Sequence, residues 1–88
     1  MDANQGEIVS ALLGAGCCVQ SLASVGRGCP DLLVYSPLRG LLLIEIKDGQ
    51  KPPSKDVSEA QKTWHKNWKG HVSIVRCFKD AMGAIGLT

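Results

Sequence analysis

The chain has 88 residues, a formal net charge of +2 and a hydrophobic fraction of 44%, which is the composition of one ordinary globular domain. So small a net charge does not by itself indicate a nucleic-acid partner. A chain of this length buries only about 60–65% of its unfolded surface, so we expect a marginal core and a second copy as a supplement.

The cysteine pattern indicates a reducing compartment. None of the four cysteines forms a Cys-x-x-Cys pair, and His65 and His71 do not complete a zinc-binding spacing. We therefore expect free, mostly buried thiols in a cytoplasmic protein. The first residues lack the basic start and apolar run of a signal peptide, and no segment approaches transmembrane length, so no membrane partner is expected.

The first helix is predicted to begin after a capping box of Asp2 and Gln5 and to end at Gly14. Glu7 lies at the edge of its apolar stripe. Two interpretations stay open for Glu7: an acid favoured in the first turn by the helix dipole, or a residue of a functional site.

Residues 17–24 alternate weakly in polarity and are expected to form the first strand. The segment 25–28 follows as a glycine-containing loop, in which the backbone can approach a phosphate closely. Arg27 in this loop is either a contact to the DNA backbone or a solvated residue of an ordinary turn.

Two apolar strands, 31–35 and 41–47, are separated by a Pro- and Gly-containing turn and are predicted to pair as an antiparallel hairpin. In such a hairpin the start of the first strand lies beside the end of the second. Asp31 begins the first strand, and Glu45 and Lys47 end the second on one face. The three charged side chains are therefore expected at the same edge.

This arrangement of two carboxylates and an ammonium suits a divalent metal. Mg²⁺ and Mn²⁺ take hard oxygen ligands, commonly one or two carboxylates with waters and a substrate phosphate. Lys47 beside them could hold the attacking water or stabilise charge on the phosphate. The alternative for Asp31, Glu45 and Lys47 is an ion pair at the surface.

The second helix is predicted to start at a capping box formed by Ser58 and Gln61 and to run to about Lys69. Gln61 either bonds back to the Ser58 amide or faces the metal site. Trp64 and Trp68 are expected in the core.

Basic residues accompany this helix and the loop before it, and His65 between its two faces is interpreted as structural. A phosphate backbone that leaves the metal site could run over these lysines, although they are equally explained as a solvated surface. With Arg27, the predicted DNA contacts are Lys51, Lys55 and Lys62. Segment 71–76 is expected to form the fourth strand, and 78–85 a short final helix or tail.

Three short motifs follow one another along the chain: Gly28-Cys29-Pro30-Asp31, Glu45-Ile46-Lys47 and Gln61. In this order they resemble the PD-(D/E)xK nuclease superfamily, and most closely its VRR-NUC branch in the small stand-alone forms that phages carry. The resemblance runs from Glu7 to about Ala81. The chain departs from the branch at its Val-Arg-Arg motif, whose nearest match here has cysteine in place of the second arginine.

The resemblance implies an α/β fold of the restriction-endonuclease type, with a mixed sheet of about four strands flanked by helices in the order α-β-β-β-α-β. It also implies metal-dependent phosphodiester hydrolysis. The catalytic roles then fall on Asp31, Glu45, Lys47, Glu7 and Gln61, and the metal ligands are Asp31 and Glu45 with help from Glu7 and the Ile46 carbonyl.

We therefore predict one nuclease domain over residues 1–88, a DNA endonuclease that depends on Mg²⁺ or Mn²⁺. Similarity to the small VRR-NUC proteins suggests a homodimer that cuts branched DNA such as four-way (Holliday) junctions. Two other functions stay open, an endonuclease for duplex or flap DNA and a non-catalytic DNA-binding module that keeps the fold. The intact set of Asp31, Glu45 and Lys47 argues against the non-catalytic module.

Overall fold

A computed structural model describes residues 5–47 and 58–87. Its sheet has four strands in the order β1-β2-β3-β4: β1 (Cys18–Ser21), β2 (Leu32–Ser36), β3 (Gly40–Ile46) and β4 (Val72–Val75). The first three strands are antiparallel and β4 runs parallel to β3, because the chain crosses over between them through a helix. The sheet is therefore mixed, as predicted.

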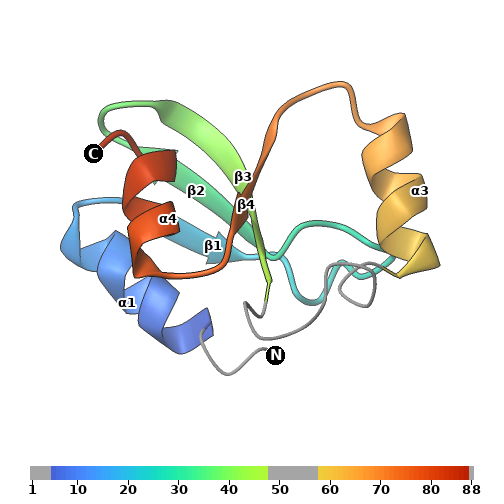
Figure 1. The fold of residues 1–88 in the computed structure, drawn as a ribbon, viewed down its shortest axis with the longest axis horizontal. Coiled ribbons are helices and arrows are strands. Elements are labelled where there is room, and N and C mark those ends of the chain that lie inside the picture. The colour runs from blue at the N-terminus through green and yellow to red at the C-terminus, as the bar shows by residue number, and fades with distance from the viewer. Residues whose placement is uncertain (1–4, 48–57, 88) are drawn as a thin grey trace.

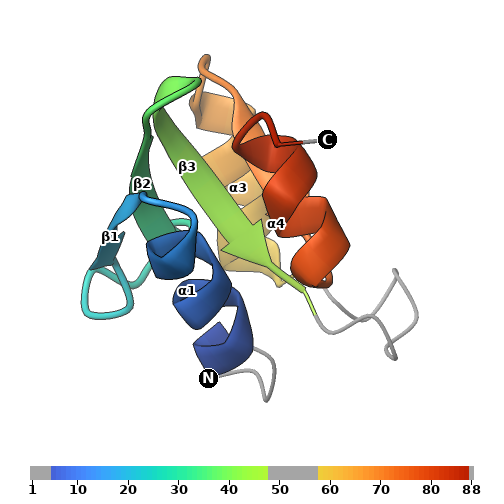
Figure 2. The same ribbon diagram turned by 90° about the vertical axis from the view of Figure 1, so that its left-hand side faces the viewer.

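The described helices are α1 (Gln5–Gly14), α3 (Glu59–Asn67) and α4 (Phe78–Ala84). Helices α1 and α4 lie side by side over one face of the sheet, and α3 stands on the other side of it (Figures 1 and 2). The element order of the predicted α/β fold is confirmed, with α4 as a final helix after β4. None of the described helices is long and apolar enough to span a membrane.

The core lies between the sheet and the α1–α4 layer. Residues of β2 and β3 alternate between this layer and the opposite face, so that Val34 and Ile44 are fully buried while Tyr35 and Leu41 are exposed. Each fully buried aliphatic side chain contributes roughly 1.5–3 kcal/mol. The core side chains are Ile8, Leu12, Cys17, Leu32, Val34, Ile44, Ile46, Val75, Ala81, Met82 and Ile85.

The turn between β2 and β3 is tied to the end of α4. The buried Ser36 hydroxyl donates a hydrogen bond to the Ile85 carbonyl over 2.9 Å and accepts one from the Leu38 amide over 3.2 Å. This anchor holds the hairpin in one register, in which Leu32 pairs with Ile44. A hairpin with a fixed register brings the same two residues together at its open end in every molecule.

Two local expectations are corrected, and a third cannot be compared with the structure. Strand β1 ends at Ser21, well before residue 24, because the Val25 amide bonds to the Leu22 carbonyl over 3.0 Å and closes a turn. All four cysteines are free, but only Cys17 is buried. The expected first capping box includes Asp2, which lies outside the described residues.

The tryptophans of α3 are not in the core. No residue of α3 is buried, and the Trp68 side chain is 46% exposed. Trp64 and Trp68 stack on each other with ring centroids 4.9 Å apart and an interplanar angle of 22°. They bury part of their surface against one another because α3 stands away from the α1–α4 side of the sheet, where the core lies.

Candidate functional site

The open end of the β2–β3 hairpin gathers the predicted charged residues. Leu32 pairs with Ile44, so the next step of the same register sets Asp31 beside Glu45. The Ile46 amide donates a hydrogen bond to Asp31 Oδ2 over 2.7 Å. In this bond the Asp31 side chain takes the place of a backbone carbonyl of the neighbouring strand, and its carboxylate is directed toward the end of β3.

Glu45 and Lys47 lie on the face of β3 that is turned away from the α1–α4 layer, as the alternation along the strand predicts. Both are nevertheless buried, and Glu45 is only 1% exposed. A buried charge is costly unless it is paired and hydrogen-bonded. The site therefore has to supply partners for Glu45 and Lys47, and helix α3 provides one that contacts both.

Gln61 of α3 bridges the two charges. Its Nε2 donates to Glu45 Oε2 over 3.1 Å, and its Oε1 accepts from Lys47 Nζ over 3.0 Å. The distance from Lys47 Nζ to Glu45 Oε2 is 3.9 Å, so the amide closes a triangle with an ion pair. The amide dipole is oriented with its oxygen at the cation and its nitrogen at the anion, which stabilises both charges.

Gln61 also completes the capping box of α3. The Ser58 amide donates to Gln61 Oε1 over 3.1 Å, and the Gln61 amide donates to Ser58 Oγ over 3.2 Å. Gln61 therefore has both of the roles considered for it, because it bonds back to the Ser58 amide and also faces Glu45 and Lys47. Gln61 Oε1 accepts hydrogen bonds from the Ser58 amide and from Lys47 Nζ. The same side chain therefore caps α3 and contacts the charged residues of the site.

The loop before β2 presses against the first turn of α3. Gly26, Arg27 and Gly28 have φ angles of 70°, 57° and 82°. A Cβ atom on Gly28 would lie 2.2 Å from the Ala60 carbonyl oxygen, so only glycine fits there. The close approach that the sequence assigned to a phosphate is made here by the backbone of α3, and it sets Gln61 against the hairpin.

No family model matches the chain, and no curated protein does. A solved structure described as a VRR_NUC domain matches 96% of this chain and 96% of its own, with 28% sequence identity and a TM-score of 0.66. The resemblance to VRR-NUC domains is confirmed.

The nearest match to the Val-Arg-Arg motif, which begins at Val75, lies at the end of β4. Val75 is buried and accepts a hydrogen bond at its carbonyl from the Lys47 amide over 2.9 Å. The Arg76 amide donates to Asp80 Oδ2 over 3.0 Å, which links β4 to the first turn of α4. The motif therefore contacts the site through the Val75 carbonyl, which is bonded to the backbone of Lys47.

Cys29, in the same loop as Asp31, is a half-buried neighbour of the carboxylates. Burial raises the pKa of its thiol, and the charges of Glu45 and Asp31 raise it further. The raised pKa moves the thiol still further from ionising at neutral pH. A neutral thiol is a poor metal ligand, so Cys29 does not change the oxygen-donor character of the site.

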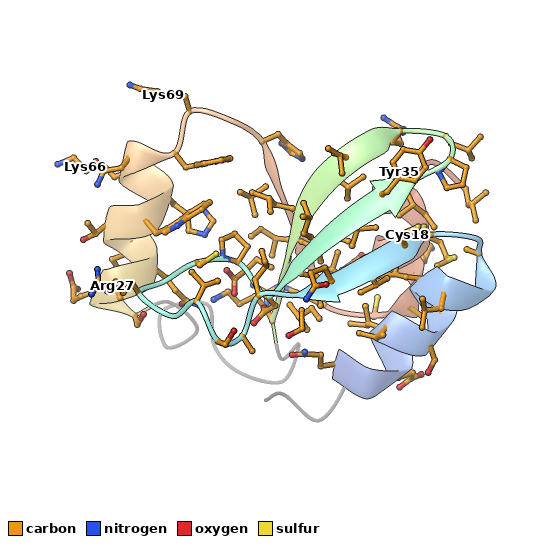
Figure 3. All side chains as sticks on the ribbon, turned by 180° about the vertical axis from the view of Figure 1, so that it is seen from behind. Cys18, Arg27, Tyr35, Lys66 and Lys69 are labelled. Carbon is orange, nitrogen blue, oxygen red and sulfur yellow. The ribbon has the colours of Figure 1, made fainter. Side chains whose placement is uncertain are left out.

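Glu7 is exposed on α1, and the part of the chain that the structure describes gathers no three His, Cys, Asp or Glu side chains closely enough to hold a metal. Glu7 is thus not beside Asp31 and Glu45, and its role stays a prediction. Arg27 is exposed beside the first turn of α3 (Figure 3).

The predicted lysine contacts are only partly described. Lys62 is exposed and pairs with Glu59 over 3.3 Å. Lys51 and Lys55 lie outside the described residues. Lys66 and Lys69 extend from the α3 side of the molecule away from the sheet (Figure 3).

Sequence reasoning missed His65. Its Nε2 lies 3.8 Å from Glu45 Oε1, the carboxylate oxygen that Gln61 does not contact. His65 follows Gln61 by four residues, so the two share one face of α3. That spacing was the available signal, and it would have pointed to His65 once Gln61 was placed in the site.

A hollow of about 480 Å³ opens beside this cluster. It falls within the range of roughly 300–1,000 Å³ that is typical of ligand sites. Among the residues that the structure describes, no acidic side chain lines it, so this lining suits an anion. Its walls are Lys47, Gln61, Lys62, His65, Lys66 and Ile74.

Proposed function

We propose that this nuclease-type, DNA-processing domain is a metal-dependent DNA endonuclease. The observation that carries the proposal is the placement of Asp31 and Glu45 side by side at the hairpin end, with Lys47 joined to Glu45 through Gln61. Two adjacent carboxylates beside a held ammonium suit phosphodiester hydrolysis, in which charge builds up on phosphate oxygens. The solved VRR_NUC domain supports the same chemistry by its name.

The donor set fits Mg²⁺ or Mn²⁺. Asp31 and Glu45 supply hard carboxylate oxygens, and the Ile46 carbonyl directly follows Glu45 in the chain. Mg²⁺ commonly takes one or two carboxylates and fills its other positions with waters and substrate phosphate, so two acids are sufficient. When bound, the metal lowers the pKa of water and polarises the phosphate.

The chain's own residues would then orient the reaction. Asp31 and Glu45 would hold the cation at the open end of the hairpin. Lys47 orients the attacking water or neutralises charge on the phosphate, and Gln61 keeps the ammonium in place. Arg27 and Lys62, together with Lys51 and Lys55 of the segment outside the described residues, would guide the DNA backbone. Each such phosphate contact adds roughly 0.9 to the salt dependence of duplex binding.

We expect the substitutions Asp31→Ala and Glu45→Ala each to abolish both Mn²⁺ binding and DNA cleavage, because each removes one of the two acidic ligands. Calorimetry with Mn²⁺ checks binding, and a panel of duplex, flap and four-way-junction DNA with Mg²⁺ or Mn²⁺ checks cleavage. Asp80→Ala, an acid at the start of α4, serves as the matched control. Retained Mn²⁺ binding in both variants would rule out this metal site, and wild-type binding of DNA without any cleavage would favour a non-catalytic module.

The open face of the sheet supports a homodimer. Tyr35 is 48% exposed and lies on the face that α1 and α4 leave uncovered, away from α3 (Figure 3). Leu41, its partner in β3, is 73% exposed. Exposed faces of antiparallel sheets are normally polar. The residues beside Tyr35 and Leu41 on β1 and β2, which are Cys18, Gln20 and Leu33, carry no charge, so this part of the face suits a second copy better than DNA.

The dimer is expected to sediment at a mass near twice the 9.4 kDa chain. Leu41→Lys should return it to monomers at micromolar concentration, because a charge cannot be buried in an apolar interface without a partner. Leu13→Lys, at an exposed leucine of α1, is the control and should stay dimeric. A wild-type chain that sediments as a monomer with and without DNA would contradict the dimer.

A two-fold dimer would present two sites to two strands, which is why we propose four-way junctions as the preferred substrate. In the cleavage panel, paired cuts in the junction should then exceed cuts in duplex and flap DNA. The Leu41→Lys monomer should lose the pairing of the cuts. Faster cleavage of duplex or flap DNA than of the junction would support the alternative of an ordinary duplex or flap nuclease.

A further inference from the structure

The imidazole of His65 faces the Glu45 carboxylate from α3. Its Nε2 lies 3.8 Å from Oε1, whereas Gln61 Nε2 is hydrogen-bonded to Oε2 over 3.1 Å. We propose that His65 is a positioning residue of the centre, which holds one oxygen of Glu45 while Gln61 holds the other. The proposal rests on the nuclease function proposed above and adds a residue that lies outside the three motifs.

The spacing along α3 makes this double hold possible. Residues four apart are neighbours on one helix face, so a single rigid element presents both Gln61 and His65 to the same carboxylate. The distance of 3.8 Å suits an ion pair and exceeds that of a direct hydrogen bond. Polar contacts in catalytic centres commonly shorten when the substrate complex forms, so a small rotation of the ring would close it.

Packing against the core does not account for the position of His65. Helix α3 has no buried residue, so the ring is not carried into the site by an apolar helix face. Its ring contact is with Trp64, edge-on, at a centroid distance of 5.5 Å and an interplanar angle of 76°. The side chain remains 34% exposed and lines the hollow beside Lys47, so its orientation is set at the site itself.

Holding both oxygens fixes the plane of the Glu45 carboxylate. That plane decides where the lone pairs of Glu45 point relative to those of Asp31. Residues that orient a metal ligand typically contribute about 10–100-fold to metal affinity or activity. The expected loss on removing His65 is of this size, far smaller than the loss on removing Glu45 itself.

The test compares His65→Ala, His65→Gln and the control His71→Ala. We expect His65→Ala to weaken Mn²⁺ binding in calorimetry about tenfold and to lower kcat about tenfold, with KM for DNA and the thermal midpoint without metal nearly unchanged. Glutamine carries an N–H near the place of the histidine Nε2, so His65→Gln should recover most of both losses. His71 bonds to Ser73 Oγ on the exposed side of β4, so His71→Ala should match wild type.

The proposal is overturned if His65→Ala matches His71→Ala in Mn²⁺ affinity and kcat. It is equally overturned if His65→Gln folds but is as impaired as the alanine variant, because the donor group would then be irrelevant. Should His65→Ala fail to fold, the glutamine variant decides alone. Loss of cleavage in Glu45→Ala beside full activity in His65→Ala would reject only this inference, whereas full activity in Glu45→Ala would reject the nuclease proposal itself.

Discussion

Replacing Lys47 by methionine is expected to reduce cleavage at least about 100-fold, in the range seen when a group that stabilises transition-state charge is removed. Methionine keeps much of the buried stem and lacks only the ammonium, so the fold should survive. DNA binding should change little, because a single buried ammonium makes at most one phosphate contact. Cleavage rates at saturating DNA and circular dichroism check the two halves of this expectation.

Mn²⁺ affinity separates this result from general damage to the site. The Lys47 ammonium lies 3.9 Å from Glu45 Oε2 and repels a cation at the same carboxylate. Lys47→Met should therefore bind Mn²⁺ as tightly as wild type or more tightly, although it does not cut. Lys69→Ala, at an exposed lysine beyond α3, is the control for loss of positive charge. A Lys47→Met enzyme that cuts at the normal rate would remove Lys47 from the mechanism.

Gly28→Ala is expected to disable the site from outside it. The new Cβ would lie 2.2 Å from the Ala60 carbonyl oxygen and 2.7 Å from the Gln61 amide nitrogen, which are backbone atoms and cannot turn aside. Helix α3 has to move away, which pulls Gln61 off Glu45 and Lys47. We expect cleavage to fall at least about tenfold, as for loss of a residue that orients a ligand.

Gly26→Ala is the matched control for Gly28→Ala. Its φ of +70° carries the same kind of backbone strain, about 1–2 kcal/mol for a left-handed alanine, but no atom lies within 4 Å of the added Cβ. The difference between the two variants in cleavage and in thermal midpoint therefore isolates the collision with α3. Equal cleavage by the two variants would mean that this contact does not position Gln61.

Much of the hairpin could be predicted from the sequence, because strand alternation is a local property. The period of two placed Ile44 and Ile46 on one face and Glu45 and Lys47 on the other, and in the structure Ile44 and Ile46 belong to the core. The turn after Ser36 implied an antiparallel register, which brings Asp31 to Glu45. The capping box at Ser58 and Gln61 was equally local and is confirmed.

The placement of α3 could not be predicted in the same way. A helical period shows which residues share a face, but not which neighbour that face meets. Trp64 and Trp68 were assigned to the core on their size, whereas the helix approaches the site through Gly28 and turns its Gln61–His65 face to Glu45. Such contacts between distant segments depend on tertiary geometry, and so His65 was interpreted as structural.

The double hydrogen bonding of Gln61 restricts which amino acid can occupy its position. In capping boxes glutamate serves as well as glutamine, since only an acceptor oxygen is needed at the helix start. Glutamate here would set a second negative charge about 3 Å from Glu45 Oε2 in place of an N–H donor, and like charges that close cannot both stay ionised. Asparagine is one methylene too short to reach both Ser58 and Glu45. Among the common residues, glutamine alone can cap α3 and also bond to both Glu45 and Lys47. Substitutions in this domain should therefore be least tolerated at position 61.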